Sequence, residues 1–248
     1  MSTLLLRLAA PLQSWGADSK FERRTTGREP TKSGVLGLLA AALGRRRNEP
    51  IDDLARLKFG VRTDKPGQVM TDFHIASNKD RTYVTRRYYL EDAAFLVGLE
   101  GNMEFLRILE AAVTVPYFPL FLGRRSCPPA GRICLGVRDI PLVDALKAEP
   151  PICAAGMDVQ NMTIVLDSDM VGAHRQRDLP ISFNPRHRKF SYRFIEIDVS
   201  GLSSENSADE YGTTHDAFEY CQVGDENESG QALQQPKVTI GCPKWGDA

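Results

Sequence analysis

The sequence predicts an α+β protein that begins with a ferredoxin-like, RNA-recognition-like βαββαβ domain. Its apolar segments follow the order strand, helix, strand, strand, helix, strand between residues 3 and 122. After the Pro150-Pro151 pair the pattern changes to strands alone. The 248 residues therefore divide into a ferredoxin-like domain at 1–150, a small β-rich region at 151–200 and an acidic tail at 201–248.

The first strand and the first helix are marked by apolar runs. Residues 3–10 are almost uniformly apolar, which is typical of a buried strand. A long, polar and basic loop at 12–32 precedes a helix at 33–43. Either Thr31 or Ser33 is suited to cap that helix, because each hydroxyl can accept a hydrogen bond from a free N–H group of the first turn.

The rest of this domain is expected to contain one more helix and several strands. Asn102 is suited to cap a helix that ends at residue 113 and carries its apolar side chains on one face. We expect strands at 57–63, 69–75, 82–90, 94–99 and 117–122. The hairpin region from about Val69 to Leu90 is additional to the βαββαβ order.

The β-rich region is expected to contain two strands, at 161–166 and 192–199, with a basic loop at 174–189 between them. The residues after Ser200 are rich in Ser, Glu, Asp and Asn and include few apolar side chains. Such a composition cannot bury enough apolar surface for a core of its own, so we expect a mobile tail.

Composition argues against several classes of protein. No apolar run approaches the roughly 20 residues that a membrane span needs, and the apolar start lacks the basic segment of a signal peptide. The five cysteines are an odd number without a CxxC pair, which argues against a disulfide framework or a zinc site. We therefore expect a cytoplasmic protein that has no metal or other cofactor and does not bind a membrane.

The net charge of −1 conceals an uneven distribution of charge. Residues 1–195 contain 29 basic and 21 acidic side chains, whereas the residues from Glu196 onward contain 2 basic and 11 acidic ones. One interpretation is an ordinary domain with a solubilising acidic tail. The other interpretation is a basic body that binds a polyanion.

Four basic stretches support the second interpretation. They lie at 20–32 together with 45–47, at 79–89, at 120–132 and at 174–189. Their arginines occur beside Gly, Ser and Thr, whose backbone N–H groups and hydroxyls also bind phosphate. The helix start at Thr31 adds free N–H groups. Trp15, Tyr88 and Tyr89 could stack on the bases of single-stranded RNA.

Each of these features also has a simpler explanation. The GREPTKSG segment lacks the GxxxxGK[ST] spacing of a P-loop, so we do not predict binding of a nucleoside triphosphate. Residues 45–47 could be a solvated helix end. Trp15 could be a packing anchor, and because Tyr88 and Tyr89 alternate along a strand, at least one of them should face a core.

No catalytic site is predicted. The four histidines do not form a metal-binding cluster, and neither a Ser-His-Asp arrangement nor a pair of catalytic carboxylates is evident. Cys127 has basic neighbours that could stabilise its thiolate, but we expect a structural cysteine. His74 or His187 could act as a general base in metal-free RNA cleavage, although neither has a partner visible in the sequence.

Four longer segments carry a family resemblance. They read LLLRLAAPLQSWG, GREPTKSGVLGLLAAALG, RRYYLEDAAFLVGL and PLFLGRRSCPPAG, in this order along the chain. In order and separation they resemble the CasD subunits of the type I-E CRISPR Cascade complex, which belong to the CRISPR-associated RAMP superfamily. The resemblance covers residues 4–132 well, extends more loosely to RDLPISFNPRHRKFSYR, and does not include the tail after Val199.

The resemblance implies a non-catalytic RNA-binding subunit of a ribonucleoprotein complex for antiviral defence. Members of the family cap the 5′ handle of the CRISPR RNA (crRNA), contact the Cascade backbone subunit and lie beside the Cascade large subunit, so target DNA is bound only indirectly. They consist of a ferredoxin-like domain, a β-hairpin thumb and a small β-rich part, and the thumb corresponds to about 74–90 here. A related branch in type I-C systems cleaves the precursor RNA with a Tyr, Lys and His constellation that does not map onto this sequence.

We therefore predict a crRNA-binding subunit with no catalytic and no metal-binding residues. The residues expected to bind RNA lie in the loop before the first helix, after that helix, in the thumb and in the turn at 124–125. They are Gln13, Trp15, Arg23, Arg24, Arg28, Lys32, Ser33, Arg46, Lys79, Arg81, Arg86, Arg87, Arg124 and Arg125. Two alternatives are a metal-free endoribonuclease that processes CRISPR repeat RNA and an RNA-recognition protein unrelated to CRISPR.

Overall fold

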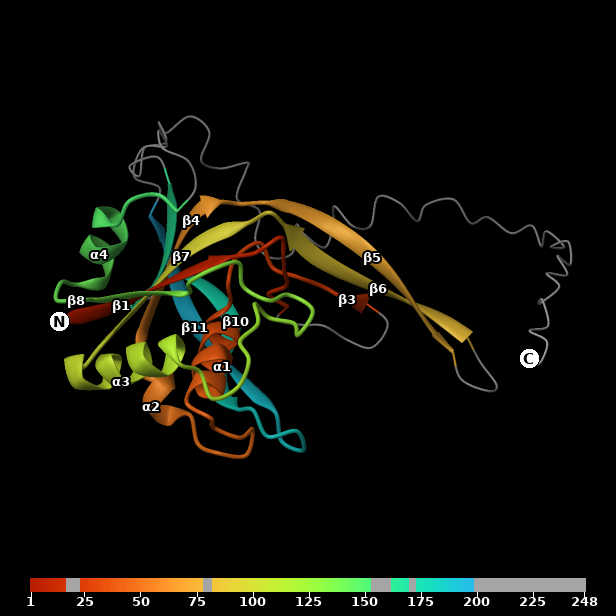
Figure 1. Cartoon of the computed structure of the whole chain (residues 1–248), viewed down its shortest axis with the longest axis horizontal. Coiled ribbons are helices and arrows are strands. Elements are labelled where there is room, and N and C mark those ends of the chain that lie inside the picture. Colours follow the sequence, from red (N-terminus) through yellow and green to blue (C-terminus); the bar gives the residue numbers. More distant parts are fainter. Residues whose placement is uncertain (17–22, 78–81, 153–161, 170–172, 199–248) are drawn as a thin grey trace, which may run out of the picture. The chain divides into compact units, whose positions relative to one another are not determined.

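A seven-stranded antiparallel sheet forms the centre of the structure, with the strand order β10-β11-β9-β4-β7-β1-β8 (Figure 1). The structure, a computed structural model, describes residues 1–16, 23–77, 82–152, 162–169 and 173–198. The strands of this sheet are β1 (Ser2–Ala9), β4 (Lys58–Lys65), β7 (Ala94–Gly101), β8 (Cys134–Arg138), β9 (Thr163–Asp167), β10 (His174–Ser182) and β11 (Lys189–Asp198). The predicted acidic tail lies outside the described residues.

Helices cover both faces of this sheet, which makes the described part of the chain an α+β structure. They are α1 (Lys32–Ala42), α2 (Asp52–Ala55), α3 (Met103–Thr114) and α4 (Leu142–Ala148). Two predicted caps are confirmed, because Thr31 Oγ1 accepts from Gly34 N at 3.2 Å and Asn102 Oδ1 accepts from Glu104 N at 2.8 Å. None of the helices in the described part of the chain has the length and apolar character needed to cross a membrane.

Strand β1 is buried on both faces of the sheet, which explains its nearly uninterrupted apolar sequence. Leu4, Leu6 and Leu8 join the larger core together with side chains from α1 and α3. Leu5 belongs instead to a smaller core with Leu96 and apolar side chains of α4. Helices α1 and α3 therefore cover one face of the β8-β1-β7-β4 part of the sheet, and α4 covers the other face.

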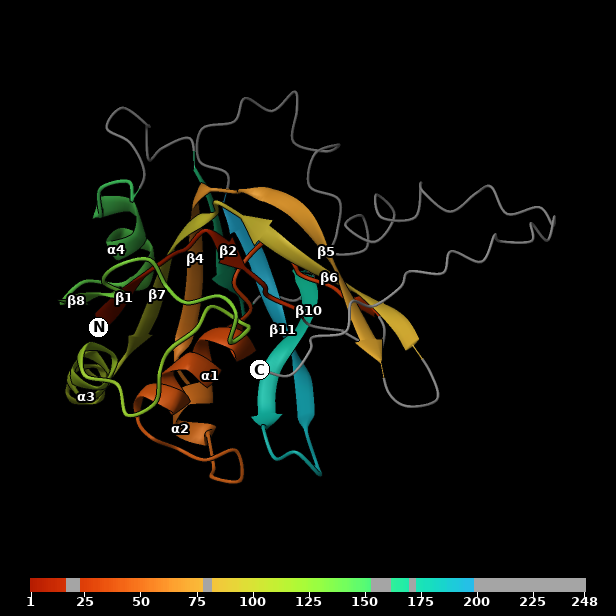
Figure 2. The same cartoon turned by 45° about the vertical axis from the view of Figure 1, so that its right-hand side comes forward.

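A second, smaller sheet contains the predicted hairpin. Its strands are β2 (Leu12–Gln13), β3 (Arg23–Arg24), β5 (Gln68–Ser77) and β6 (Thr82–Glu91). Strands β5 and β6 form a long hairpin that extends away from the seven-stranded sheet (Figures 1 and 2). Because β5 occupies one edge of β6, the short strands β2 and β3 pair with the opposite edge. The loop after β1 is thereby held against the hairpin.

The prediction of a strand at 117–122 is wrong, and the strand that lies beside β1 at this edge of the sheet is β8. Residues 117–122 pass over the end of α1 instead. The backbone N–H groups of Tyr117 and Phe118 donate to Ala42 O and Ala41 O at 3.0 and 3.3 Å. These donors complete the end of the helix, so they are not available for pairing within a sheet.

The predicted basic loop at 174–189 is also wrong for most of its length, because it contains strand β10. Strand β10 pairs with β11 as an antiparallel hairpin that contains irregularities of register. The alternation of exposed arginines with the buried Asp178 conceals this strand in the sequence. The other two predicted strands of the region are confirmed as β9 and β11, and β9 pairs with β4. Helices α2 and α4 were not predicted.

Candidate nucleic-acid interface

The first two basic stretches lie side by side because β3 pairs with β6. In this parallel pairing Arg23 is level with Arg86, and Arg24 is level with Arg87. The chain after β1 thus returns to the hairpin β5–β6 at β3, which Figure 1 labels next to β6.

The third basic stretch reaches the same place through a tight turn. Gly123 has a φ of +83°, and a Cβ atom at this position would lie 1.7 Å from the backbone oxygen of Ser14. Glycine is therefore required for the turn to approach the loop after β1. Within the turn, Cys127 N donates to Arg124 O at 2.9 Å. The Arg124 side chain extends to β3, where its Nη2 donates to Arg24 O at 2.7 Å.

Four side chains from these stretches form a group that we call the Tyr89 cluster: Arg87, Tyr89, Arg124 and Ser126. The guanidinium carbon of Arg124 lies 4.7 Å from the centroid of the Tyr89 ring. Burial alone would raise the pKa of Tyr89, but hydrogen bonds with Ser126, Arg124 and Arg87, together with the charge of Arg124, lower that pKa below its ordinary value. Two arginines therefore converge on one buried hydroxyl.

Two donors of the Tyr89 cluster are unsatisfied. Arg87 Nε and Arg124 Nη1 are buried and have no hydrogen-bond partner among the described residues. A buried donor without a partner costs about 1–3 kcal/mol, and more when it carries charge. A phosphate oxygen accepts hydrogen bonds from guanidinium groups, and its negative charge offsets their positive charge. The cluster therefore has the chemistry of a site for an anion.

Two predicted RNA contacts, Gln13 and Trp15, are buried and bind each other instead, with 0% and 1% of their surface exposed. Gln13 Nε2 donates to Ala93 O at 2.7 Å, and Gln13 Oε1 accepts from Trp15 Nε1 at 3.0 Å. The Trp15 ring lies against Gly34 at the start of α1. Because their polar atoms are used within the protein, these residues hold the loop in place and do not present a surface to RNA.

Lys32 is likewise buried, and its charge is neutralised within the protein. Lys32 Nζ lies 2.7 Å from Asp167 Oδ2, and the backbone N–H of Lys32 donates to Asp178 Oδ2 at 2.8 Å. Arg193 binds the same two carboxylates, with Nη1 2.7 Å from Asp167 Oδ1 and Nε 2.6 Å from Asp178 Oδ1. We call these four residues the Arg193 network. It attaches the β10–β11 hairpin to the start of α1, so the prediction that Lys32 binds RNA does not fit its position.

Glu29 lies beside the Arg193 network. Burial raises the pKa of its carboxyl to about 7, while the charge of Arg193 opposes that rise and the charge of Asp178 adds to it. Glu29 is therefore partly protonated near neutral pH, although it lies in a loop rich in arginine.

The other predicted contacts that the structure describes are partly or fully exposed. Arg86 lies on the hairpin with its guanidinium carbon 5.9 Å from the centroid of the Phe73 ring, and Ser33 Oγ lies 3.4 Å from the Thr31 hydroxyl. The most exposed ones are Arg24, Arg28, Arg46 and Arg125. The side chain of Arg23 and the whole of Lys79 and Arg81 lie outside the described residues.

The sequence analysis did not identify Ser126. It predicted that Tyr89 could stack on bases, whereas in the structure the Tyr89 hydroxyl binds Arg87 and Arg124. The RRYY segment contained a signal, since alternation along β6 places Arg87 and Tyr89 on one face of the strand. The contribution of Ser126 depends on the turn that begins at Gly123, which connects residues far apart in the chain.

The described residues offer little for catalysis. No group of three His, Cys, Asp or Glu side chains that could hold a metal ion is present among them. His74 has a partner that the sequence did not reveal, because its Nε2 lies 2.5 Å from Asp72 Oδ2 on the same strand. Burial raises the pKa of the Cys127 thiol, which supports a structural cysteine.

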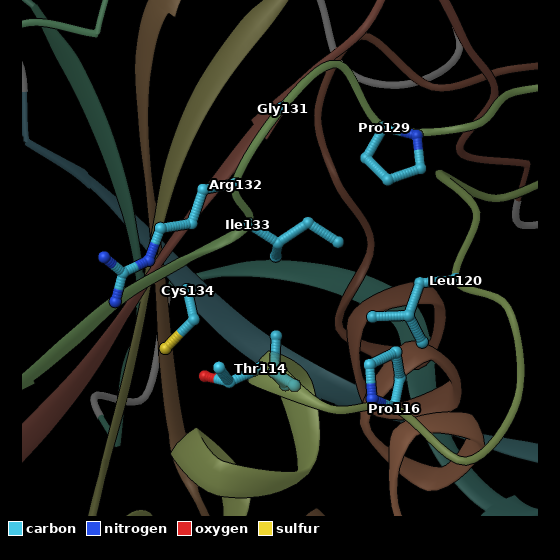
Figure 3. Close-up of a pocket in the computed structure, with 9 residues that line it drawn as sticks. Thr114, Pro116, Leu120, Pro129, Gly131, Arg132, Ile133 and Cys134 are labelled. Carbon is cyan, nitrogen blue, oxygen red and sulfur yellow. The ribbon is translucent and has the colours of Figure 1, made fainter.

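A cavity of about 330 Å³ lies between the end of α3 and the segments 116–120 and 129–134 (Figure 3). It is lined by Val113, Thr114, Pro116, Leu120, Pro129, Gly131, Arg132, Ile133 and Cys134. Arg132 is the one charged residue of this lining, and none of the predicted RNA contacts belongs to it. The cavity is therefore a mainly apolar groove, separate from the Tyr89 cluster.

Comparison with known proteins identifies relatives of this chain. The family described as CRISPR-associated protein (Cas_Cas5) matches residues 3–196. The CRISPR system Cascade subunit CasD of Escherichia coli (strain K12) is 37% identical over 158 residues, which is 54% of this chain and 70% of that protein. Among solved structures, a "Crystal structure of Cas protein" is 41% identical, has a TM-score of 0.67 and covers 80% of this chain and 94% of the other. A chain of a "CRISPR RNA-guided surveillance complex" is 32% identical, has a TM-score of 0.69 and covers 80% and 90%.

Proposed function

The chain belongs to the Cas5 family of CRISPR-associated proteins, and from this premise we propose that it is a non-catalytic, crRNA-binding subunit of a CRISPR RNA-guided surveillance complex. The names of two relatives support this proposal, since one is a Cascade subunit and the other is part of a surveillance complex. In such a complex the subunit serves antiviral defence in the cytoplasm, and it caps the 5′ handle of the crRNA.

The observation that carries the proposal is the Tyr89 cluster. Arg87 and Arg124 come from segments that are distant in the sequence, yet both contact the Tyr89 hydroxyl and both retain a buried donor without a partner. A backbone phosphate of the handle would accept from these donors. Arg24 and Arg125 lie on exposed parts of the adjoining strand and turn, where they would contact neighbouring phosphates.

The surrounding elements fit further parts of the proposal. The order β8-β1-β7-β4 with α1 and α3 on one face supports assignment of a ferredoxin-like core. We assign hairpin β5–β6 as the thumb, with exposed apolar side chains at Phe73, Ile75 and Val84 that suit contact with the Cascade backbone subunit or with RNA bases. The large subunit would dock beside this protein.

The test is to purify the chain with its neighbouring subunits and to sequence the RNA that remains bound. We expect crRNA with an intact 5′ handle, and we expect the Arg87→Ala, Arg124→Ala double variant to lose handle-bearing RNA from the purified complex. Arg107→Ala on α3 is the control, because it removes the positive charge of an exposed arginine that lies outside the proposed site. Equal RNA content in the double variant and the control would contradict the proposed handle site.

A metal-free endoribonuclease is the second candidate, and the Asp72–His74 pair is the observation that favours it. The register places Asp72 directly across from Arg87, on the face of the hairpin that carries the Tyr89 cluster. Incubating the purified protein with labelled repeat RNA and EDTA separates the two candidates. We expect no cleavage, whereas a discrete product with a cyclic phosphate end that disappears in His74→Ala would establish the enzyme.

A further inference from the structure

A second surface that combines exposed arginines with aromatic rings lies on the β10–β11 hairpin. We call it the β10–β11 outer face and define it by Arg175, Arg177, Tyr192 and Phe194. Strand β10 is at the edge of the seven-stranded sheet. Along β11, Arg193 is buried toward α1, so Tyr192 and Phe194 on either side of it point to the opposite face of the sheet.

The two aromatic rings of this face are open to solvent. Tyr192 is 47% exposed and Phe194 is 45% exposed. The guanidinium carbon of Arg175 lies 3.9 Å from the centroid of the Tyr192 ring, and Arg175 is the cross-strand neighbour of Phe194. Stacking of arginine on tyrosine restricts the positions of both groups, and exposed arginine and aromatic side chains are the groups on which single-stranded bases stack.

The described elements leave this face uncovered. Helices α1 and α2 pack against β10 from the side of the Arg193 network. Helix α4 covers β4, β7 and β1 on the other side of the sheet. It contacts β11 at the C-terminal end of that strand, where Lys147 Nζ lies 2.9 Å from Asp198 Oδ2.

The charge around this face is mainly positive. The exposed cations continue from Arg175 and Arg177 to the end of the hairpin, which carries Arg186, Arg188 and Lys189. Burial lowers the pKa of Arg188, and the charge of Arg47 lowers it further, so two segments contribute cations at that end. Asp178 is turned inward and bound by Arg193, and Glu196 is the exposed carboxylate in the described part of β11.

We propose that the β10–β11 outer face binds a second segment of single-stranded RNA, separate from the segment bound at the Tyr89 cluster. Bases stack on Tyr192 and Phe194, while Arg175 and Arg177 bind the phosphates between them. The inference rests on the proposed function, because the guide RNA is the polyanion that such a complex contains. The excess of arginine over carboxylate favours RNA over a protein partner, whose contact surface would need acids to pair with these cations.

The test uses the full chain and a single-stranded RNA of about eight uridines, a length typical of such surfaces, in which some uridines are replaced by the photoreactive 5-iodouridine. After irradiation, cross-linked peptides are identified by mass spectrometry. We expect one cross-link in residues 189–198, at Tyr192 or Phe194, and another near Tyr89. Arg175→Gln keeps the rings of Tyr192 and Phe194 but removes a cation, so the yield at β11 should fall about fivefold. The yield near Tyr89 should not change, because Arg175 does not belong to the Tyr89 cluster. Arg107→Gln on α3 is the matched control and should change neither yield.

Several results would overturn the inference. One is the absence of a cross-link in 189–198 while the Tyr89 region reacts, and another is a β11 yield that Arg175→Gln does not change. A tenfold preference for the same oligonucleotide made of DNA would contradict binding of RNA. Loss of a neighbouring subunit from complexes of Tyr192→Ala with unchanged RNA content would show a protein interface instead. A cross-link at β11 without one near Tyr89 would support this inference and contradict the proposed handle site, so the two failures are distinguishable.

Discussion

Two arginine clusters in this protein contain the same kind of cation but have opposite surroundings. In the Arg193 network, Lys32 and Arg193 share the carboxylates of Asp167 and Asp178, with four contacts of 2.6–2.8 Å. In the Tyr89 cluster, the two guanidinium groups surround a hydroxyl, and each has a buried nitrogen without a partner among the described residues. The difference shows that the available acceptors, and not the arginines themselves, distinguish a structural cluster from a candidate binding site.

The comparison leads first to a prediction about the Arg193 network, with the largest expected effect. Arg193→Ala leaves the fully buried Asp178 without its main cation, so the free energy of unfolding should fall by about 3–5 kcal/mol. Urea unfolding measures this loss, with Arg107→Ala as the control for removal of an exposed arginine. A loss below about 1 kcal/mol would mean that the network does not hold the β10–β11 hairpin in place.

A change in the Tyr89 cluster should have the opposite outcome. Arg124→Ala removes a buried donor that lacks a partner, but it also removes the hydrogen bond from Nη2 to Arg24 O and the contact with the Tyr89 ring. Because the gain and the losses offset each other, the free energy of unfolding should change by less than about 1 kcal/mol. The affinity for handle RNA should fall about tenfold, because one charged hydrogen bond to phosphate is lost. The neighbouring and exposed Arg125 is the matched control, and its replacement by Ala should weaken binding less. Equal losses of RNA affinity in Arg124→Ala and Arg125→Ala would show that the Tyr89 cluster does not differ from the rest of the turn in RNA binding.

Glu29, which lies beside the Arg193 network, predicts a dependence of stability on pH. Folding raises the pKa of Glu29 from 4.5 to about 7, so the folded state holds this proton more tightly. The resulting contribution to stability is complete below pH 4.5 and is lost as the pH rises through about 7. Glu29→Gln should remove this decline and stabilise the protein at about pH 8 by about 3 kcal/mol, because each pH unit between 4.5 and about 7 corresponds to about 1.4 kcal/mol. Parallel stability curves of the two proteins across this range would argue against a raised pKa of Glu29 in the folded state.

The smallest expected effect concerns the hydroxyl that the two arginines share. Tyr89→Phe keeps the ring under Arg124 but removes the hydrogen-bond partner of both guanidinium groups. We expect handle RNA to bind about threefold more weakly, since one neutral hydrogen bond contributes on the order of 1 kcal/mol. Titration with fluorescent RNA measures the change, and unaltered binding would show that the hydroxyl does not orient the arginines.

Much of the fold could be predicted because it depends on local patterns. The apolar run of β1 and the Thr31 and Asn102 caps are encoded by neighbouring residues, and each is confirmed. The strand expected at 117–122 failed because its N–H groups bind the end of α1, a contact between distant segments. Strand β10 was missed because a buried acid within a row of arginines does not follow a simple alternation of apolar and polar residues.

The site could be predicted only in part, for the same reason. The sequence indicated three basic stretches, and the structure places parts of them side by side at β3, at β6 and in the turn after Gly123. It could not show that Lys32 is neutralised, because Asp167 lies 135 residues further along the chain. It also could not show that Gln13 and Trp15 bind each other inside the protein. Tertiary contacts decide which polar side chains have hydrogen-bond partners, and these contacts cannot be predicted from composition.

The most direct test of the central claim is the salt dependence of handle RNA binding by the Arg87→Ala, Arg124→Ala double variant. If both arginines bind phosphate, the slope of log K against log salt concentration should become less steep by about 1.4, at about 0.7 for each contact with a single strand. The Arg107→Ala control should keep the original slope. A double variant that binds with the original slope and affinity would show that the Tyr89 cluster does not hold the RNA.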